Sequence, residues 1–341
     1  MLKFDYEDFN KKKLKEIFSI FGNPSKTKVA YFSTYFPNYT RTESVLNYFK
    51  ELNIDFNFIG TNKRFFKYPL SLYYLLKNVR KYDVIFVAFR GHEILPFVKI
   101  IAKIFRKPVI YDGFISVYDT LCFDRQVIRS DSIIGKCLKK YDRFLCQISN
   151  TVLVDTKTHC EYFKDEFQVN NVDYIYVGCN KKIFKPLNVK KETNKFTVFW
   201  YGSSNPVHGV EVILQSARII QDITSNVMYQ LVGPVKKNYQ SLLSKLNLKN
   251  ITLIEWIPYK LLPDEIAKAN LCLGGHFAKS IPKANRVIAG KTYQFVNMKK
   301  PTILGENSAN LELFDNNNNE IFYCEMGNAN QLANTILKLS K

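Results

Sequence analysis

The chain lacks several features that would assign it to a class at once. None of its seven cysteines belongs to a CxxC pair, which argues against zinc-ribbon and thioredoxin-type sites and predicts reduced, mostly buried thiols. Its longest apolar runs, such as Val84–Phe89, are far shorter than the ~18 residues of a membrane-spanning helix. The first ten residues are polar and acidic, so we predict no secretory signal and a cytoplasmic location.

Negative charge is also scarce: 49 Lys and Arg face 30 Asp and Glu, a net charge of +19. Both halves of the chain are basic, the first more so. Such a charge favours anionic partners, which include nucleic acids, acidic membranes and phosphorylated substrates. A basic nucleic-acid-binding protein is therefore an alternative, but no helix-turn-helix, RNP-like or zinc signature accompanies the charge, so we expect no nucleic-acid partner.

The length of 341 residues and the hydrophobic fraction of 46% fit two globular domains. Short apolar segments alternate with helical patterns, which is typical of parallel sheets with crossover helices. The alternation stops in the polar stretch 181–194 and then restarts. The patterns predict strands at 28–32, 55–59, 84–89, 109–111, 151–154, 173–176, 196–201, 227–232, 251–255, 271–274 and 301–304.

Two segments of the second half could bind phosphate. The loop between Gly202 and Gly209 joins a strand to a helix, and the free N–H groups of such a helix start attract anions. Arg286 and Lys291 flank a second helix start, where they could neutralise a diphosphate. An ordinary strand-to-helix turn and a solvated basic loop are the structural alternatives.

Two segments of the first half follow buried strands, whose carboxyl ends face the ligand in α/β proteins. Arg90 and His92 follow the strand predicted at 84–89, and the imidazole could act as an acid, a base or a hydroxyl ligand. Asp112 directly follows the next strand, predicted at 109–111, and Asp119 lies a few residues further on. These groups could equally be structural, as a buried histidine or a turn carboxylate.

The blocks WYGSSNPVHGVEVILQSARII, LVGP, NITLIEWIPY, LPDEIAKANLCLGG and KANRVIAGKTYQFVNMKKPTILGENSANLELF resemble the second half of GT-B glycosyltransferases of family 4. The first half resembles the acceptor domain of a prokaryotic branch of that family. The resemblance implies an α/β fold with two Rossmann-like domains facing a central cleft. It places an acceptor-binding domain at 1–185, a nucleotide-sugar-binding domain at 186–326 and a C-terminal helix at 327–341 that could pack back on the first domain.

The resemblance also implies a reaction, in which a sugar moves with retention of configuration from a nucleoside diphosphate sugar to a glycan or lipid-linked acceptor. No DxD triplet is present, so we predict a metal-independent transferase with no cofactor beyond its co-substrate. The catalytic residues are expected to be His92, Asp112 and Lys291. Arg90, His92 and Asp119 are expected to bind the acceptor. The residues expected to bind the donor are Gly202, Ser203, Ser204, His208, Gly209, Trp256, Ile257, Arg286, Lys291, Gln294 and Glu312.

The sequence departs from the usual family pattern at four of these positions. Ser203 and His208 stand where Arg and Lys are common, and Arg286 and Gln294 stand where a pair of Glu is common. A non-catalytic GT-B subunit is therefore an alternative. A sugar-nucleotide epimerase and a glycan phosphorylase share the architecture, but the first needs more acidic residues and the second a cofactor lysine that we cannot place.

Two stretches mix basic and apolar residues at helical spacing, namely 63–81 and 98–107. This pattern fits a peripheral location on an anionic membrane, where a lipid-linked acceptor would be available. The alternative is a helix whose apolar side faces the core while its lysines are solvated.

Overall fold

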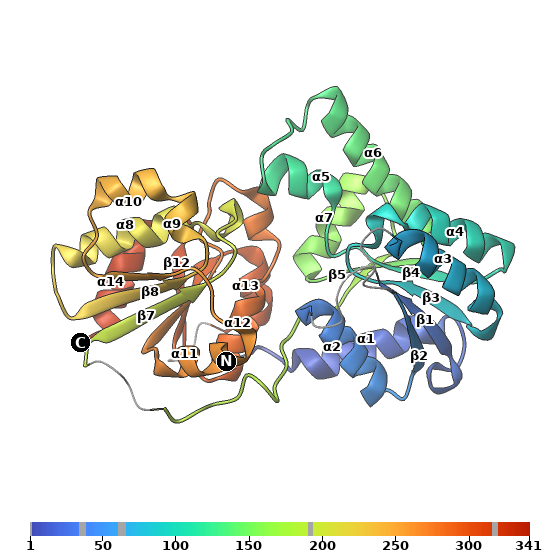
Figure 1. The fold of residues 1–341 in the computed structure, drawn as a ribbon, viewed down its shortest axis with the longest axis horizontal. Coiled ribbons are helices and arrows are strands. Elements are labelled where there is room, and N and C mark those ends of the chain that lie inside the picture. The colour runs from blue at the N-terminus through green and yellow to red at the C-terminus, as the bar shows by residue number, and fades with distance from the viewer. Residues whose placement is uncertain (1, 34–38, 61–65, 190–193, 316–319) are drawn as a thin grey trace. The chain divides into compact units, whose positions relative to one another are not determined.

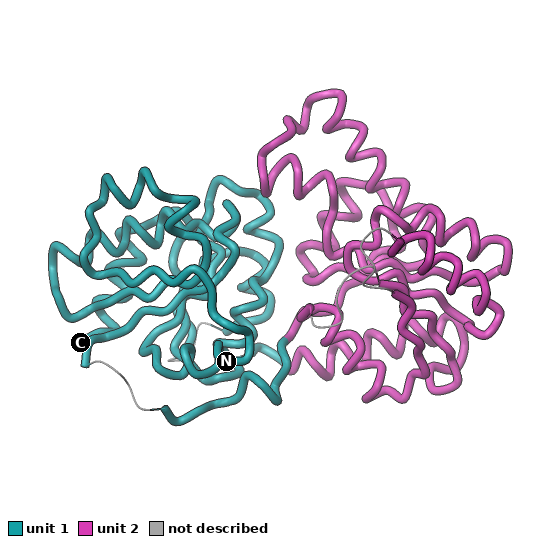
Figure 2. Tube along the Cα trace, viewed as in Figure 1, with its two compact units in different colours: residues 1–4, 179–341 teal, residues 5–178 magenta. Residues whose placement is uncertain are grey.

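The computed structural model describes residues 2–33, 39–60, 66–189, 194–315 and 320–341, and the chain divides into two compact units. The N-terminal unit comprises residues 5–178, and the C-terminal unit comprises residues 1–4 and 179–341 (Figure 2). The sequence boundary at 185/186 therefore falls inside the second unit. Residues 2 and 3 pair with the end of a C-terminal helix, as Lys3 N–H donates to the Leu313 carbonyl at 2.8 Å.

The N-terminal unit is built around a six-stranded sheet in the order β2-β1-β3-β4-β5-β6, and every neighbouring pair is parallel. Its strands are β1 Lys28–Phe32, β2 Asp55–Ile59, β3 Val84–Val87, β4 Val109–Asp112, β5 Thr151–Val154 and β6 Val172–Tyr174. Its helices are α1 Tyr6–Ser19, α2 Thr40–Glu51, α3 Lys67–Asn78, α4 Leu95–Ile104, α5 Val117–Asp119, α6 Ile133–Ile148 and α7 Lys157–Phe167.

Helices cover both faces of this sheet (Figure 1) because its central strands are apolar on both sides. One core cluster joins alternate strand residues such as Ile85 and Val87 to α3, α4, α6 and α7. The residues between them, such as Val84 and Phe86, pack with α1 and α2 on the opposite face. The period of two along each strand thus divides the helices into two layers.

The C-terminal unit has a second six-stranded parallel sheet, in the order β12-β11-β10-β7-β8-β9. Its strands are β7 Phe196–Tyr201, β8 Val227–Val232, β9 Ile251–Ile254, β10 Leu271–Gly275, β11 Thr302–Glu306 and β12 Ile321–Glu325. Its helices are α8 Val210–Gln221, α9 Val235–Asn238, α10 Gln240–Leu246, α11 Leu262–Lys268, α12 Gly290–Asn297, α13 Ser308–Leu313 and α14 Ala329–Leu339.

The last helix, α14, belongs to the core of this unit. Leu332, Ala333 and Ile336 lie in one cluster with α8 and the strands, and all three are fully buried. The apolar side of α14, which the sequence suggested could pack back on the first domain, is therefore used within the C-terminal unit.

All eleven strands expected from the sequence are present, and β12 is a twelfth that was missed. The prediction of an α/β fold with two Rossmann-like sheets is confirmed. Within the described ranges, no helix has the length and apolarity needed to cross a membrane.

Candidate functional site

The order of the second sheet defines where a ligand would bind. The chain winds outward from β7 to β8 and β9 on one side, then returns so that β10 pairs with β7 on the other. The loops after β7 and β10 therefore diverge at a topological switch point, which is the ligand-binding position of open α/β sheets. The loop 202–209 follows β7, and Lys291 lies on the helix that follows β10.

Lys291 and this loop are in direct contact. The Lys291 ammonium Nζ lies 3.3 Å from His208 Nδ1 and 4.6 Å from the ring centroid of Trp200. It also lies 3.2 Å from the position that a Cβ atom would occupy on Gly202. Two segments far apart in the sequence thus converge on one buried cation, which is 5% exposed.

Burial controls the protonation of this cluster. It lowers the pKa of Lys291 to about 7, because the charged ammonium loses hydration that no carboxylate replaces. Burial, followed by Lys291 and His276, lowers the pKa of His208 well below its usual value. Burial, followed by Lys291 and Lys283, lowers the pKa of His276 to about 3. Both imidazoles are therefore neutral at pH 7, and His208 Nδ1 can accept a hydrogen bond from the protonated lysine.

His276 was missed by the sequence reasoning. It directly follows β10, and its ring stacks on His208 with centroids 5.1 Å apart. Its position after a strand of the switch point is the signal that could have found it, since the same rule selected His92 in the first half.

Two glycines allow the backbone of this region to close up. Gly209 has φ +63, and a Cβ there would lie 2.6 Å from the backbone of Phe277 and Ala278. Gly233, which follows β8, has φ +136, and its Cβ would lie 2.0 Å from the Gly202 carbonyl oxygen. Neither position can carry a side chain without displacing backbone.

Two polar atoms of β7 and the loop after it are buried without a hydrogen-bond partner among the described residues. They are Nε1 of Trp200 and Oγ of Ser204, and the second residue has φ +56. Buried polar groups are normally satisfied, and an orphan in a native structure often marks the place of a water or ligand. These two atoms and the Lys291 ammonium therefore suit a polar, anionic ligand.

The other residues predicted to bind a donor lie in the same unit and differ in exposure. Ser203 is exposed in the loop, and Trp256 after β9 is 73% exposed, with Ile257 half-buried beside it in the chain. Arg286 before α12 and Glu312 on α13 are half-buried. Their roles stay predictions.

Gln294, which was predicted to bind the donor, has its side chain hydrogen-bonded within the protein. It is buried on α12, one turn after Lys291, and its Oε1 accepts a hydrogen bond from the Tyr201 hydroxyl. This contact ties α12 to the end of β7 and so helps to hold Lys291 at the switch point.

The N-terminal unit places the predicted catalytic residue Asp112 in a buried ion pair. Asp112 is fully buried, and its two carboxylate oxygens accept hydrogen bonds from Arg41 on α2, at 3.1 Å and 3.2 Å. Arg41 also donates to the carbonyls of Val154 and Ile175. The carboxylate that the sequence suggested as catalytic is therefore engaged in a buried ion pair that joins α2 to three strand ends. Arg41 was not foreseen, because nothing local marks an arginine as buried.

Asp119 is likewise inaccessible. It is fully buried on α5, and its N–H donates to Ser116 Oγ at 2.8 Å. The same turn is held by Asp142 of α6, whose carboxylate accepts from the Ser116 hydroxyl and from two backbone N–H groups. Burial raises the pKa of Asp142 to about 6. In this conformation the side chain predicted to bind the acceptor is therefore shielded from solvent.

His92 and Arg90 remain candidates. They follow β3, which pairs with β1 at the switch point of the first sheet. His92 is partly buried, and burial together with Arg90 lowers its pKa, so the imidazole is neutral at pH 7. Its carbonyl accepts a hydrogen bond from the Tyr141 hydroxyl at 2.6 Å. Arg90 is exposed with φ +61.

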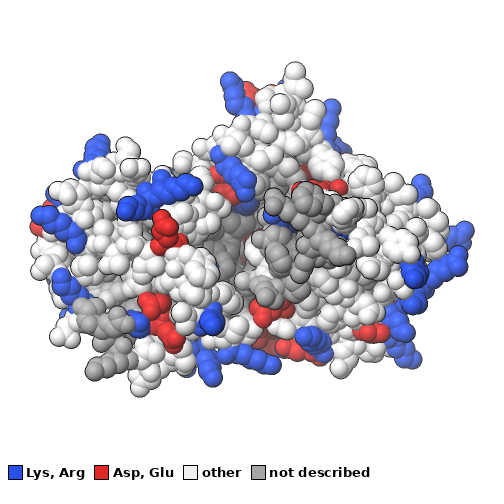
Figure 3. Space-filling model, viewed as in Figure 1, with Lys and Arg blue, Asp and Glu red and all other residues white. Residues whose placement is uncertain are grey.

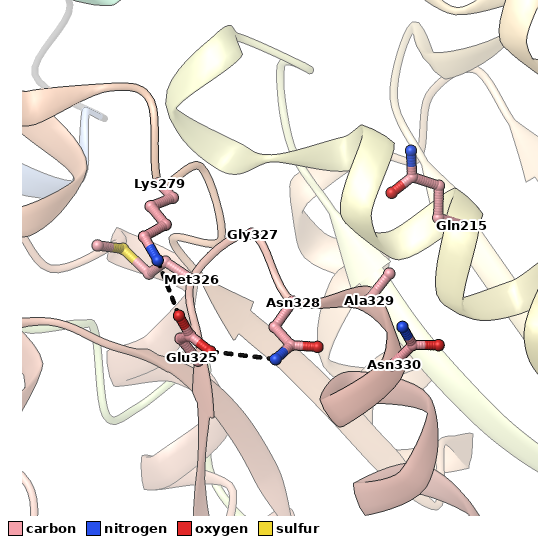
Figure 4. A pocket seen from close by; sticks show the side chains of 8 residues that line it. All are labelled: Gln215, Lys279, Glu325, Met326, Gly327, Asn328, Ala329 and Asn330. Carbon is pink, nitrogen blue, oxygen red and sulfur yellow. Dashed lines mark hydrogen bonds and ion pairs between the residues drawn. The ribbon is translucent and has the colours of Figure 1, made fainter.

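A separate cavity of about 310 Å³ opens before α14 (Figure 4). Its two charged side chains pair, as Glu325 accepts from Lys279 at 2.8 Å, and Glu325 also accepts from the Asn328 amide at 3.1 Å. This cavity contains none of the residues predicted to bind the donor. Among the described residues, no three His, Cys, Asp or Glu side chains gather as a metal site requires.

Comparisons with known proteins give the same architecture. No family model and no curated protein matches the sequence. Among solved structures, HepE from Anabaena in complex with UDP and glucose is 14% identical, with a TM-score of 0.62 over 92% of this chain and 91% of that one. Sucrose-phosphate synthase from Thermosynechococcus elongatus is 12% identical, with a TM-score of 0.64 over 92% and 90%. The lipopolysaccharide outer core galactosyltransferase WaaB is 11% identical, with a TM-score of 0.55 over 92% and 91%.

At sequence identities of 11–14%, the structural similarity to these proteins establishes the fold of this chain. The chain has the GT-B fold, with two Rossmann-like domains, as the sequence resemblance implied. Membership of family 4 stays a prediction.

Proposed function

We propose that the protein is a retaining glycosyltransferase, which moves a sugar from a nucleoside diphosphate sugar to a glycan or lipid-linked acceptor without a metal ion. One observation carries the proposal: Lys291 is buried against His208 and Gly202 at the switch point of a GT-B sheet. Burial alone lowers the pKa of this lysine, so its ammonium form would be stabilised by an anionic ligand. A diphosphate fits both the charge and the narrow, glycine-lined approach.

The reaction makes a specific demand on this centre. The bond from the anomeric carbon to the diphosphate oxygen breaks, a bond to the acceptor oxygen forms on the same face, and the acceptor proton leaves with the diphosphate. Negative charge therefore grows on the leaving phosphate in the transition state. Lys291 and the N–H groups that begin α8 after Gly209 would stabilise that charge, because they are fixed before the reaction starts.

The remaining donor contacts follow from the same placement. Ser204 Oγ and Trp200 Nε1 would meet phosphate or sugar oxygens, which would satisfy both buried groups. The exposed Trp256 would stack on the nucleobase beside Ile257, and Arg286 and Glu312 would bind the rest of the donor. UDP is the first nucleotide to test, because the HepE structure holds UDP and glucose.

The acceptor would meet the N-terminal unit at Arg90 and His92. Neutral His92 can accept a hydrogen bond from an acceptor hydroxyl, because protonation would leave it only a donor. Asp112 and Asp119 are not assigned a part in this step, since the first is paired with Arg41 and the second is buried.

A thermal-shift screen tests the proposal directly. Sugars linked to UDP, GDP, ADP and CMP are each titrated into the protein. We expect the sugars of one nucleotide to raise the melting temperature, and the increase should grow with the logarithm of the ligand concentration. Lys291→Ala should lose the shift, whereas Lys237→Ala, an exposed lysine on α9, should keep it. A shift with DNA or RNA alone would favour the nucleic-acid binder.

The finer claims need the reaction itself. NMR of the product should show the anomeric configuration of the donor, and turnover should persist in EDTA. An inverted product or loss of turnover in EDTA that Mg²⁺ restores would refute retention or metal independence, respectively. Nucleotide binding without transfer to any glycan or lipid-linked acceptor would favour the non-catalytic subunit.

A further inference from the structure

One surface of the N-terminal unit presents apolar side chains to solvent on helices that are otherwise well packed. On α4, Leu95, Val98 and Ala102 are buried in the core. On the same helix, Phe97, Ile100 and Ile104 are 55%, 59% and 68% exposed. Their spacing of three and four residues places them on one stripe of the helix, so α4 is apolar on its outer side as well as its inner side.

The neighbouring helix α3 extends this surface. It packs on the same face of the sheet as α4, and Tyr73, Tyr74 and Leu76 are exposed on it. The Arg80 guanidinium, just after α3, lies 5.4 Å from the ring centroid of Phe105, just after α4, so the two helix ends are in contact. We call this combined surface the α3–α4 face.

Its charge is of one sign. Residues 66–81 and 94–107 contain no Asp or Glu. Lys and Arg side chains gather at the edge of the unit where α3 and α4 lie (Figures 1 and 3). The cations on these two segments are Lys67, Lys77, Arg80, Lys81, Lys99, Lys103, Arg106 and Lys107.

We propose that the α3–α4 face docks on an anionic phospholipid bilayer. Apolar and aromatic side chains flanked by cations, with no carboxylates, match the acyl boundary and the negative headgroups of such a surface. A protein partner fits less well, because the buried centres of protein interfaces are depleted in lysine. The sequence left the second stretch, 98–107, between a core helix and a membrane helix, and α4 has both properties on opposite sides.

The proposal goes beyond glycosyl transfer and does not depend on it. It is tested by flotation of the full chain with vesicles of phosphatidylcholine and phosphatidylglycerol in equal parts, at low salt. We expect the protein to float with these vesicles, to float poorly with phosphatidylcholine alone, and to be released by high salt. Failure to float with the anionic vesicles would overturn the proposal.

Two variants localise the contact. Phe97→Ser/Ile100→Ser/Ile104→Ser removes the apolar stripe, and Lys103→Gln/Arg106→Gln removes charge beside it. Each should reduce the vesicle partition coefficient at least about tenfold. The matched control on the C-terminal unit is Ile223→Ser/Lys236→Gln/Lys237→Gln, whose target side chains are exposed and which should float like the wild type.

Other occupants give different results. A wild-type dimer in gel filtration that the stripe variant converts to monomers would assign the face to a second copy and overturn the proposal. Unchanged flotation of both α3–α4 variants would do the same. UDP thermal shifts of the same variants, measured without vesicles, report on the donor site separately, so loss of membrane binding and loss of the proposed function are distinguishable.

Discussion

Nζ of Lys291 lies 3.3 Å from Nδ1 of His208, and whenever the lysine is protonated the imidazole must be the acceptor of this hydrogen bond. A protonated His208 would present a second donor to the ammonium. The strongly lowered pKa of His208 agrees with this reading. The histidine therefore holds the lysine side chain in place without adding charge to the site.

Replacement of Lys291 should affect turnover more than folding. Lys291→Ala removes a buried cation whose charged form burial disfavours, so stability should hold or increase. Turnover should fall at least ~100-fold, the scale found for one transition-state donor. The measurement is initial rate at saturating donor, with Lys237→Ala as the surface control. Near-wild-type turnover would remove Lys291 from the mechanism.

Donor binding should weaken as the solution becomes alkaline. The pKa of Lys291 is about 7 in the free protein, and a bound diphosphate favours the protonated form. Above pH 7 binding therefore requires uptake of a proton, and the affinity for UDP should fall by up to about tenfold per pH unit. Calorimetry in buffers of different ionisation enthalpy measures that proton directly.

Lys291→Arg is the matched variant for this prediction, because arginine stays protonated throughout the range. Its affinity for UDP should be nearly constant between pH 7 and pH 9. An equal pH dependence in the wild type and in Lys291→Arg would assign the titration to another group.

The same lowered pKa should make the stability of the ligand-free protein increase with pH, whereas it makes donor binding decrease. Between pH 7 and 10.5, the usual value for lysine, the unfolded chain keeps a proton on Lys291 that the folded chain has released. Its contribution therefore makes the ligand-free protein more stable as pH rises through this window. The difference in melting temperature between wild type and Lys291→Met should shift in favour of the wild type from pH 7 to pH 10. A difference that is constant with pH would contradict the lowered pKa.

Gly209→Ala should destabilise the C-terminal unit by ~1–3 kcal/mol, because φ is positive and the new methyl group meets backbone at 2.6 Å. Gly290→Ala is the control, since a Cβ there meets nothing within 4 Å at the start of α12. It should leave stability unchanged or raise it slightly. Urea unfolding of both variants measures the free energy of unfolding. If both substitutions lowered it equally, the backbone around Gly209 would be able to accommodate a methyl group at little cost.

Removal of either partner of the Arg41–Asp112 pair should cost ~3–5 kcal/mol, because the other charge is left buried. Arg41→Met/Asp112→Leu should recover part of that loss. The exposed pair Arg129–Asp131 is the control, and its disruption should change stability little. If Asp112→Asn instead folds as stably as wild type and loses only turnover, the carboxylate is catalytic after all.

The fold could be predicted from the sequence because its strands are buried on both faces and therefore appear as short apolar runs. VIFVAF and FTVFWY each contain a strand, β3 and β7. The strand β12, IFYCE, was missed because its run is short and partly polar, as suits a strand at the edge of the sheet.

The parts of the candidate site that depend on strand order and on the loops after the strands could be predicted from the sequence. Gly202, Gly209 and Lys291 were selected for phosphate chemistry, and in the structure Lys291 lies against Gly202 and against His208, the residue before Gly209. The roles of individual carboxylates were not predictable in the same way. Asp112 follows a strand as a catalytic residue would, but only the fold reveals that Arg41, seventy-one positions earlier, lies against it.

The extreme N-terminus has a practical consequence for dissecting the protein. Because Leu2 pairs with Phe314 while residue 5 already belongs to the other unit, the backbone passes between the units twice. A protease cut at 178/179 would leave the two fragments joined by those few terminal residues, held without a covalent bond. Proteolysis alone should therefore not separate the two halves, and mild acid or detergent should be needed as well. A shortened chain that starts at residue 179 would lose this pairing and expose the end of α13.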